Sequence, residues 1–141
     1  MQNDHAPSAA PLLKQLTPVI LVDAVEPCLP FWVDRFGFTV DAEVPGPDGA
    51  LQFAILSRDG IEVMYQTRAS AVADLPDSDD DLTGHSIGLF ISVDDLDAVE
   101  RALDGAPVVK PRHQTFYGSS EIYVREPGGN TVGFAQMGAE A

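Results

Sequence analysis

The sequence predicts an α+β fold of two repeated βαβββ modules, because the second half of the chain repeats the pattern of the first. The dipeptide Val22-Asp23, which precedes a helical pattern, recurs as Val93-Asp94. The strand pattern at 61–66 recurs at 131–136. Two spaced matches at nearly one offset are typical of an internal duplication. Two similar half-sheets that pack together leave a cleft between them, and the residues lining that cleft decide the function.

The first module spans residues 16–67 and begins with a strand and a helix. Residues 18–22 form an apolar, β-branched run of strand length. Asp23 is the predicted N-cap, and Pro27 suits the first helical turn, where a missing N–H costs little. Apolar residues then recur at i, i+3, i+4 and i+7, and Gly37 ends the helix. This face consists of Leu29, Val33, Phe36 and the predicted core residue Trp32.

Three further strands complete each module, separated by turns rich in proline, glycine, aspartate and asparagine. In the first module these strands are predicted at 38–44, 51–57 and 61–66. The second module, residues 86–137, begins with a strand at 86–93 and a helix capped by Asp94 or Asp95. Its remaining strands are predicted at 106–109, 121–125 and 131–136.

The segments outside the modules are polar. Residues 68–85, which include the acidic run 77–81, are interpreted as a linker. Residues 1–15 are interpreted as a flexible N-terminal arm, since they lack the basic and apolar regions of a signal peptide. No apolar run approaches the length of a membrane span.

Composition narrows the class of partner and the compartment. The 141 residues carry a net charge of −14, which argues against nucleic acid and anionic membrane surfaces and favours cationic partners. Cys28 is the only cysteine, so an intrachain disulfide is excluded and a reducing, cytoplasmic location is expected. Its place near a helix N-terminus could lower the thiol pKa, but we interpret it as an inert small residue.

Two motifs resemble the vicinal-oxygen-chelate superfamily of glyoxalases, bleomycin-resistance proteins and dioxygenases. Residues 31–38, FWVDRFGF, are similar to the helix end of that family, and residues 122–130, IYVREPGGN, to its last hairpin. The resemblance covers about residues 16–137 and is closest to the bleomycin-resistance proteins. It implies a curved, eight-stranded half-barrel over a cleft, and a homodimer that in relatives often exchanges modules.

The same resemblance locates the positions at which metal-using relatives carry ligands. They fall at Thr17, Glu62, Gly88 and Gly133, and only Glu62 can coordinate a divalent ion. A catalytic site needs about three protein ligands. His85 is three residues from the Gly88 position, an odd shift that reverses the face of a strand. The sequence therefore predicts no metal, no other cofactor and no assigned catalytic residue.

Strand alternation and the resemblance predict the lining of the cleft. If Glu62 faces the cleft, the residues two and four positions later face it too, and the glycines of the second module leave space. An aromatic-glycine pair at 116–118 resembles the loop that flanks the drug groove in bleomycin-resistance proteins. The predicted ligand-binding residues are Glu62, Met64, Gln66, Phe90, Phe116 and Tyr117.

The favoured hypothesis is a metal-independent protein that binds and sequesters a cationic or aromatic small molecule, with antibiotics as candidates through the resemblance. We expect no nucleic acid and no membrane partner. An alternative within the same superfamily is a metal-dependent glyoxalase-type lyase or isomerase, or a ring-cleaving dioxygenase, with Glu62 as one ligand. A third hypothesis is a regulatory or scaffolding module whose cleft is filled by its own side chains, such as Phe90 and Met64.

Overall fold

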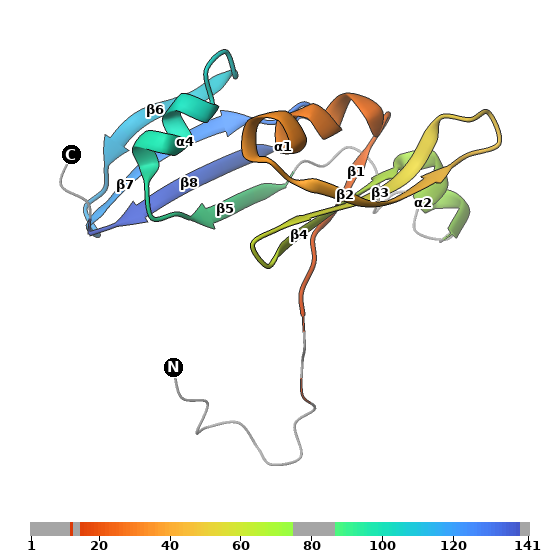
Figure 1. Ribbon diagram of the computed structural model, residues 1–141, viewed down its shortest axis with the longest axis horizontal. Coiled ribbons are helices and arrows are strands. Elements are labelled where there is room, and N and C mark those ends of the chain that lie inside the picture. The colour runs from red at the N-terminus through yellow and green to blue at the C-terminus, as the bar shows by residue number, and fades with distance from the viewer. Residues whose placement is uncertain (1–11, 13–14, 75–86, 139–141) are drawn as a thin grey trace.

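The computed structural model describes residue 12, residues 15–74 and residues 87–138. Within them, eight strands form two separate four-stranded sheets, one in each half of the chain. Figure 1 shows the two sheets next to each other, with helix α1 (Leu29–Phe36) above the place where they meet. The predicted α+β fold of two βαβββ modules, open rather than closed into a barrel, is confirmed.

The first sheet has the order β1-β4-β3-β2, in which β1 runs parallel to β4 and the other neighbours are antiparallel. The parallel pair follows from the connection, because a helix must cross over before the chain returns. Its strands are β1 (Val19–Val22), β2 (Thr39–Pro45), β3 (Leu51–Arg58) and β4 (Ile61–Thr67).

The helical segment of this module begins as a short 3₁₀ turn, η1 (Glu26–Cys28), and continues as α1. The predicted cap was wrong: no side chain caps either piece, and Asp23 instead accepts a 2.9 Å bond from Arg68. The predicted C-terminal stop is confirmed, since Gly37 has φ = 68° and its N–H bonds to the carbonyl of Val33.

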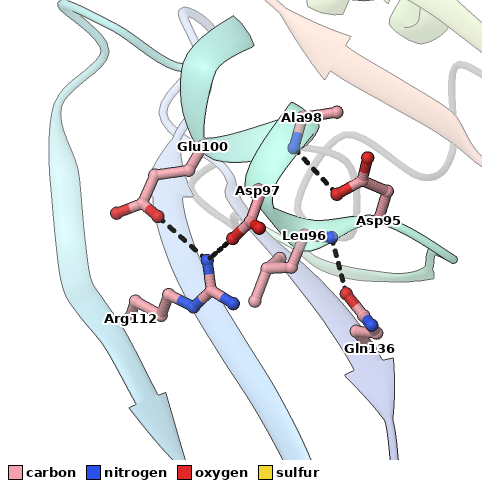
Figure 2. A network of polar contacts seen from close by, with 7 residues as sticks. All are labelled: Asp95, Leu96, Asp97, Ala98, Glu100, Arg112 and Gln136. Carbon is pink, nitrogen blue, oxygen red and sulfur yellow. Dashed lines mark hydrogen bonds and ion pairs between the residues drawn. The ribbon is translucent and has the colours of Figure 1, made fainter. Parts of the chain in front are cut away.

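The second sheet repeats this topology with the order β5-β8-β7-β6. The crossover helix α4 (Leu96–Ala102) is capped by Asp95, whose carboxylate accepts from the N–H of Ala98, and Gln136 accepts from the N–H of Leu96 (Figure 2). The strands are β5 (Gly88–Ser92), β6 (Val108–Gln114), β7 (Ser119–Arg125) and β8 (Thr131–Met137).

A further helix, α2 (Arg68–Asp74), occupies the start of the segment that we interpreted as a linker. It places Ala71 in a buried position, and Ser70 accepts a bond from Gln66 of β4. The expectations for the N-terminal arm up to residue 14, His5, the acidic run 77–81, His85 and Ser86 lie outside the described residues. No helix of the described segments is long and apolar enough to cross a membrane.

Burial along the last strands corrects the alignment of the two copies. Val63 and Tyr65 of β4 face the core, as do Val132 and Phe134 of β8. Matching 61–66 to 131–136 aligns core-facing residues of one strand with outward-facing residues of the other. The match is wrong by one residue, and such a shift reverses the face of every side chain in a strand. The offset between these strands is therefore odd, and Glu62 corresponds in face to Thr131 and Gly133.

A buried polar network connects the modules. The indole N–H of Trp32 donates to the hydroxyl of Tyr65 at 2.8 Å, and that hydroxyl donates to Glu126 at 2.6 Å. The other oxygen of Glu126 accepts from both the backbone and the side-chain nitrogens of Asn130. All four side chains are at most 3 % exposed. Because charged groups are seldom buried without partners, this network specifies how α1 and β4 meet the second module.

Apolar packing crosses the same junction. Phe36 of α1 stacks on Phe134 of β8 with ring centroids 5.1 Å apart. Cys28 lies in this core, and burial, reinforced by the charge of Glu126, raises the pKa of its thiol to about 12. The interpretation of Cys28 as an inert residue therefore holds, since the thiolate is the reactive form.

Candidate functional site

A groove of about 570 Å³ lies on the face of the second sheet that α4 does not cover. It forms because β7 alternates: Ile122 and Val124 face the core, whereas Glu121 and Tyr123 face the groove. Its lining consists of Val109, Lys110, His113, Gln114, Thr115, Phe116, Tyr117, Glu121 and Tyr123. The groove therefore combines β6, β7 and the loop between them.

Glu121 is the chemical centre of this groove. Its side chain is 1 % exposed, and its oxygens accept bonds from Tyr117 at 2.6 Å, Ser119 at 2.7 Å and Tyr123 at 2.8 Å. No Lys, Arg or His within residues 15–74 and 87–138 forms an ion pair with it. The groove therefore holds a buried negative charge whose hydrogen-bond donors are three hydroxyl groups.

Hydrogen bonding keeps Glu121 ionised. Burial acts to raise the pKa of its carboxyl group, but the three donated hydrogen bonds, with a smaller contribution from His113, outweigh burial and lower the pKa below its usual value. A group with a depressed folded pKa stabilises the fold above its unfolded pKa, and this stabilisation is lost as the pH falls through the folded value. The negative charge is thus present across the neutral range.

The ring of Tyr123 covers the position where we expected space. A Cβ atom added to Gly133 would lie 2.3 Å from Cε2 of Tyr123, its partner in the β7–β8 register. The expectation of space is therefore wrong at Gly133. At Gly88 it is right, because a Cβ atom there would meet no atom within 4 Å. Glycine at 133 thus allows the tyrosine ring to lie flat on the sheet and reach Glu121.

Aromatic rings border the groove on two sides. Phe116 is fully exposed and meets Tyr117 edge to face at 5.1 Å, and His113 stacks on Tyr123 at 6.1 Å. Exposed aromatic faces bind planar rings by stacking and bind cations through their quadrupole. A buried carboxylate behind these rings adds attraction for a positive charge. The arrangement therefore suits a planar or cationic organic molecule.

The structure divides the six predicted ligand-binding residues into separate sets. Phe116 and Tyr117 line the groove, whereas Glu62, Met64 and Gln66 lie along one face of β4. Phe90 is 56 % exposed on β5, opposite Gly133 in the register.

Sequence reasoning missed seven of the nine groove residues, among them the charged or aromatic Lys110, His113, Glu121 and Tyr123. The alternation of residues 121–124 was the available signal, because polar and apolar side chains alternate there as on a strand with one buried face.

The positions that would hold a metal in relatives do not fit one here. Glu62 accepts bonds from Thr17 at 2.9 Å and Gln15 at 2.8 Å, so its neighbours are a hydroxyl and an amide. Gly88 offers no side chain, and the ring of Tyr123 covers Gly133. Across the described residues, no three His, Cys, Asp or Glu side chains are grouped so that they could share an ion.

All three tyrosines of the chain are expected to lose their hydroxyl protons at a higher pH than a free tyrosine. Burial and Glu126 raise the pKa of Tyr65, the bond to Glu121 raises that of Tyr117, and burial together with Glu121 raises that of Tyr123 to about 12. At pH about 10, the usual midpoint, tyrosinate absorbance of the folded chain should therefore be below half of its full value. The protonated phenols stabilise the fold below that pH, and the gain is lost as the pH rises through the folded values. A folded-state midpoint near the unfolded one would contradict the geometry of Glu121 and Glu126.

Comparison with known proteins agrees with this fold. The family model described as the Glyoxalase/Bleomycin resistance protein/Dioxygenase superfamily matches residues 13–134. Uncharacterized protein Mb0911c of Mycobacterium bovis is 31% identical over 121 residues, which cover 82% of this chain and 78% of that protein.

Solved structures are similar at lower identity. A lactoylglutathione lyase from Agrobacterium tumefaciens has a TM-score of 0.69 and 18% identity, covering 89% of this chain and 95% of that one. TnmS3, an antibiotic binding protein from Streptomyces sp. CB03234, has a TM-score of 0.59 and 22% identity, covering 89% and 98%. These likenesses establish the fold. Together with the family match, they show that the chain belongs to the glyoxalase/bleomycin resistance protein/dioxygenase superfamily.

Proposed function

We propose that this protein binds and sequesters a planar, cationic small molecule in the groove around Glu121, without a metal ion. The observation that carries the proposal is the buried carboxylate, which accepts hydrogen bonds from three hydroxyl groups and forms no ion pair with any described residue, although Lys110 and His113 line the same groove. A cation bound over the rings supplies the missing positive charge. The antibiotic binding protein of similar fold supports antibiotics as candidate ligands.

We further propose that a second copy of the chain completes the cleft. Within one chain the strands form two separate sheets, so the β4 face with Glu62 and the groove around Glu121 belong to different sheets. Three large apolar side chains are exposed on or beside these uncovered faces: Phe90 (56 %), Val19 (43 %) and Met137 (59 %). A homodimer would bury them. Light scattering should then give twice the 15.1 kDa mass of the chain; a monomer at micromolar concentration would contradict the dimer.

Calorimetric titration tests the ligand class directly. The panel contains bleomycin-type glycopeptides, planar cationic antibiotics, and neutral and anionic compounds of the same ring size, all with a chelator present. We expect binding by cationic aromatic members, and weaker or no binding by their anionic counterparts. Preference for the anionic compounds, or no binding by any member at high micromolar concentration, would overturn the proposed antibiotic ligand.

A further inference from the structure

A second groove, of about 840 Å³, lies on the helix side of the molecule, where the two modules meet. One wall consists of η1 and α1, and the other of the end of α4 and the turn between β7 and β8. It is separate from the groove around Glu121, with which it shares no lining residue.

Three of the eight basic side chains of the sequence line this groove: Arg35, Arg101 and Arg125. Arg58, Arg68 and Arg112 lie outside it, and each forms an ion pair with a carboxylate. Figure 2 shows Arg112 between Asp97 and Glu100. None of the three groove arginines forms an ion pair with any described residue, although the sequence has 22 acidic residues.

The guanidinium groups keep free donors. Nη1 of Arg35 donates to the carbonyls of Ala102 at 3.1 Å and Asp104 at 2.6 Å, which fixes the group at the end of α4. Arg125 makes one bond, to the carbonyl of Gly129 at 3.2 Å, and Arg101 makes none to the described residues. A guanidinium presents five N–H donors in a fork that matches the oxygens of phosphate or carboxylate.

Much of the remaining lining is apolar and rigid. Four prolines and one phenylalanine line the groove: Pro27, Pro30, Pro107, Pro127 and Phe31. Proline has no N–H and a fixed φ, so these walls offer contact surface rather than hydrogen-bond donors. An inorganic anion would use the arginines but leave this apolar surface unused.

We propose that this groove binds an organic anion, whose phosphate or carboxylate group contacts Arg101, Arg125 and the free donors of Arg35. Its apolar body lies against the prolines and Phe31. The site is independent of the proposed function, because it lies on the other side of the sheets and takes a ligand of opposite charge. Asp34, Asp104 and Glu126 also line the groove, and their carboxylates weaken binding by repulsion.

Titration of the full chain with phenyl phosphate, benzoate and inorganic phosphate tests the proposal. We expect phenyl phosphate or benzoate to bind with a dissociation constant of about 1 mM or lower. Inorganic phosphate should bind at least about tenfold more weakly than phenyl phosphate, because it lacks an apolar body. The double variant Arg101→Gln/Arg125→Gln should weaken binding at least about tenfold, and Asp34→Asn should strengthen it.

Arg112→Gln is the matched control, since it removes a basic side chain that already has two carboxylate partners. It should change the affinity less than about twofold. The proposal is wrong if neither organic anion binds, if Arg112→Gln weakens binding as much as the double variant, or if inorganic phosphate binds as tightly as phenyl phosphate. A change of molecular mass in the double variant would instead identify the groove as a subunit interface and would also overturn the proposal.

Discussion

Replacing Tyr65 by phenylalanine is expected to lower the free energy of unfolding by about 2–4 kcal/mol, because two buried groups lose their partner at once. The indole N–H of Trp32 loses its acceptor, and Glu126 loses the hydroxyl donor to one of its oxygens. Urea unfolding, followed by the fluorescence of the single tryptophan, measures the change.

Tyr117→Phe is the control for this substitution. It removes the same atom from a side chain that is 48 % exposed, and the oxygen of Glu121 that loses this donor still accepts a bond from Ser119, so the stability should change less. If the two variants lowered the stability equally, the buried network of Trp32, Tyr65 and Glu126 would contribute no more than hydrogen bonds at the surface, which would contradict this prediction. The cost of Tyr65→Phe therefore measures how strongly the modules are joined.

Gly133→Ala is the second large expected effect. The new methyl group would overlap the ring of Tyr123, and overpacking of this kind typically costs about 1–3 kcal/mol. The ring must move to relieve the overlap, which breaks the 2.8 Å bond to Glu121 and alters the groove. Binding of the cationic ligand should weaken together with stability, as measured by calorimetry and thermal unfolding.

Gly88→Ala is its matched control, because both glycines were predicted on the cleft face and only one is covered. A methyl group at 88 meets nothing within 4 Å, and the backbone there does not require glycine. The free energy of unfolding of the Gly88→Ala variant should therefore differ little from that of the unmodified chain. If Gly88→Ala destabilised the chain as much as Gly133→Ala, the position of the Tyr123 ring would be wrong.

The fold was predictable from the sequence because its elements follow simple periodicities. All eight strands lie near their predicted positions, since apolar and polar residues alternate or form short apolar runs. Strand β6 is longer than predicted because it continues through Pro111. Proline is unusual inside a sheet, but β6 is an edge strand with register shifts, where a missing N–H is tolerated. Helix α2 was missed because its short, alanine-rich sequence has no clear apolar period.

The candidate site was less predictable than the fold. Phe116 and Tyr117 were identified through a family resemblance, and they line the groove. Glu121 was identified from the sequence only as the first residue of a strand. A buried, functional carboxylate is recognised by its hydrogen-bond partners, and the sequence does not show these. Those partners are a tyrosine four residues before it, a serine two before it and a tyrosine two after it, and only the β-turn and strand geometry bring their hydroxyls together. The spacing of apolar residues predicts strands, but it does not predict which side chains form hydrogen bonds with one another.

The central claim is that ligand binding depends on Glu121 and needs no metal, and a comparison of Glu121→Gln with Glu62→Gln tests it most directly. Both variants remove one carboxylate charge, at the groove and at the ligand position of metal-using relatives respectively. In chelator-treated protein, we expect Glu121→Gln to weaken binding of a cationic aromatic ligand at least about tenfold, and Glu62→Gln to change it less than about twofold. Binding that is restored by a divalent metal and abolished by Glu62→Gln would contradict the claim and support the metal-dependent enzyme.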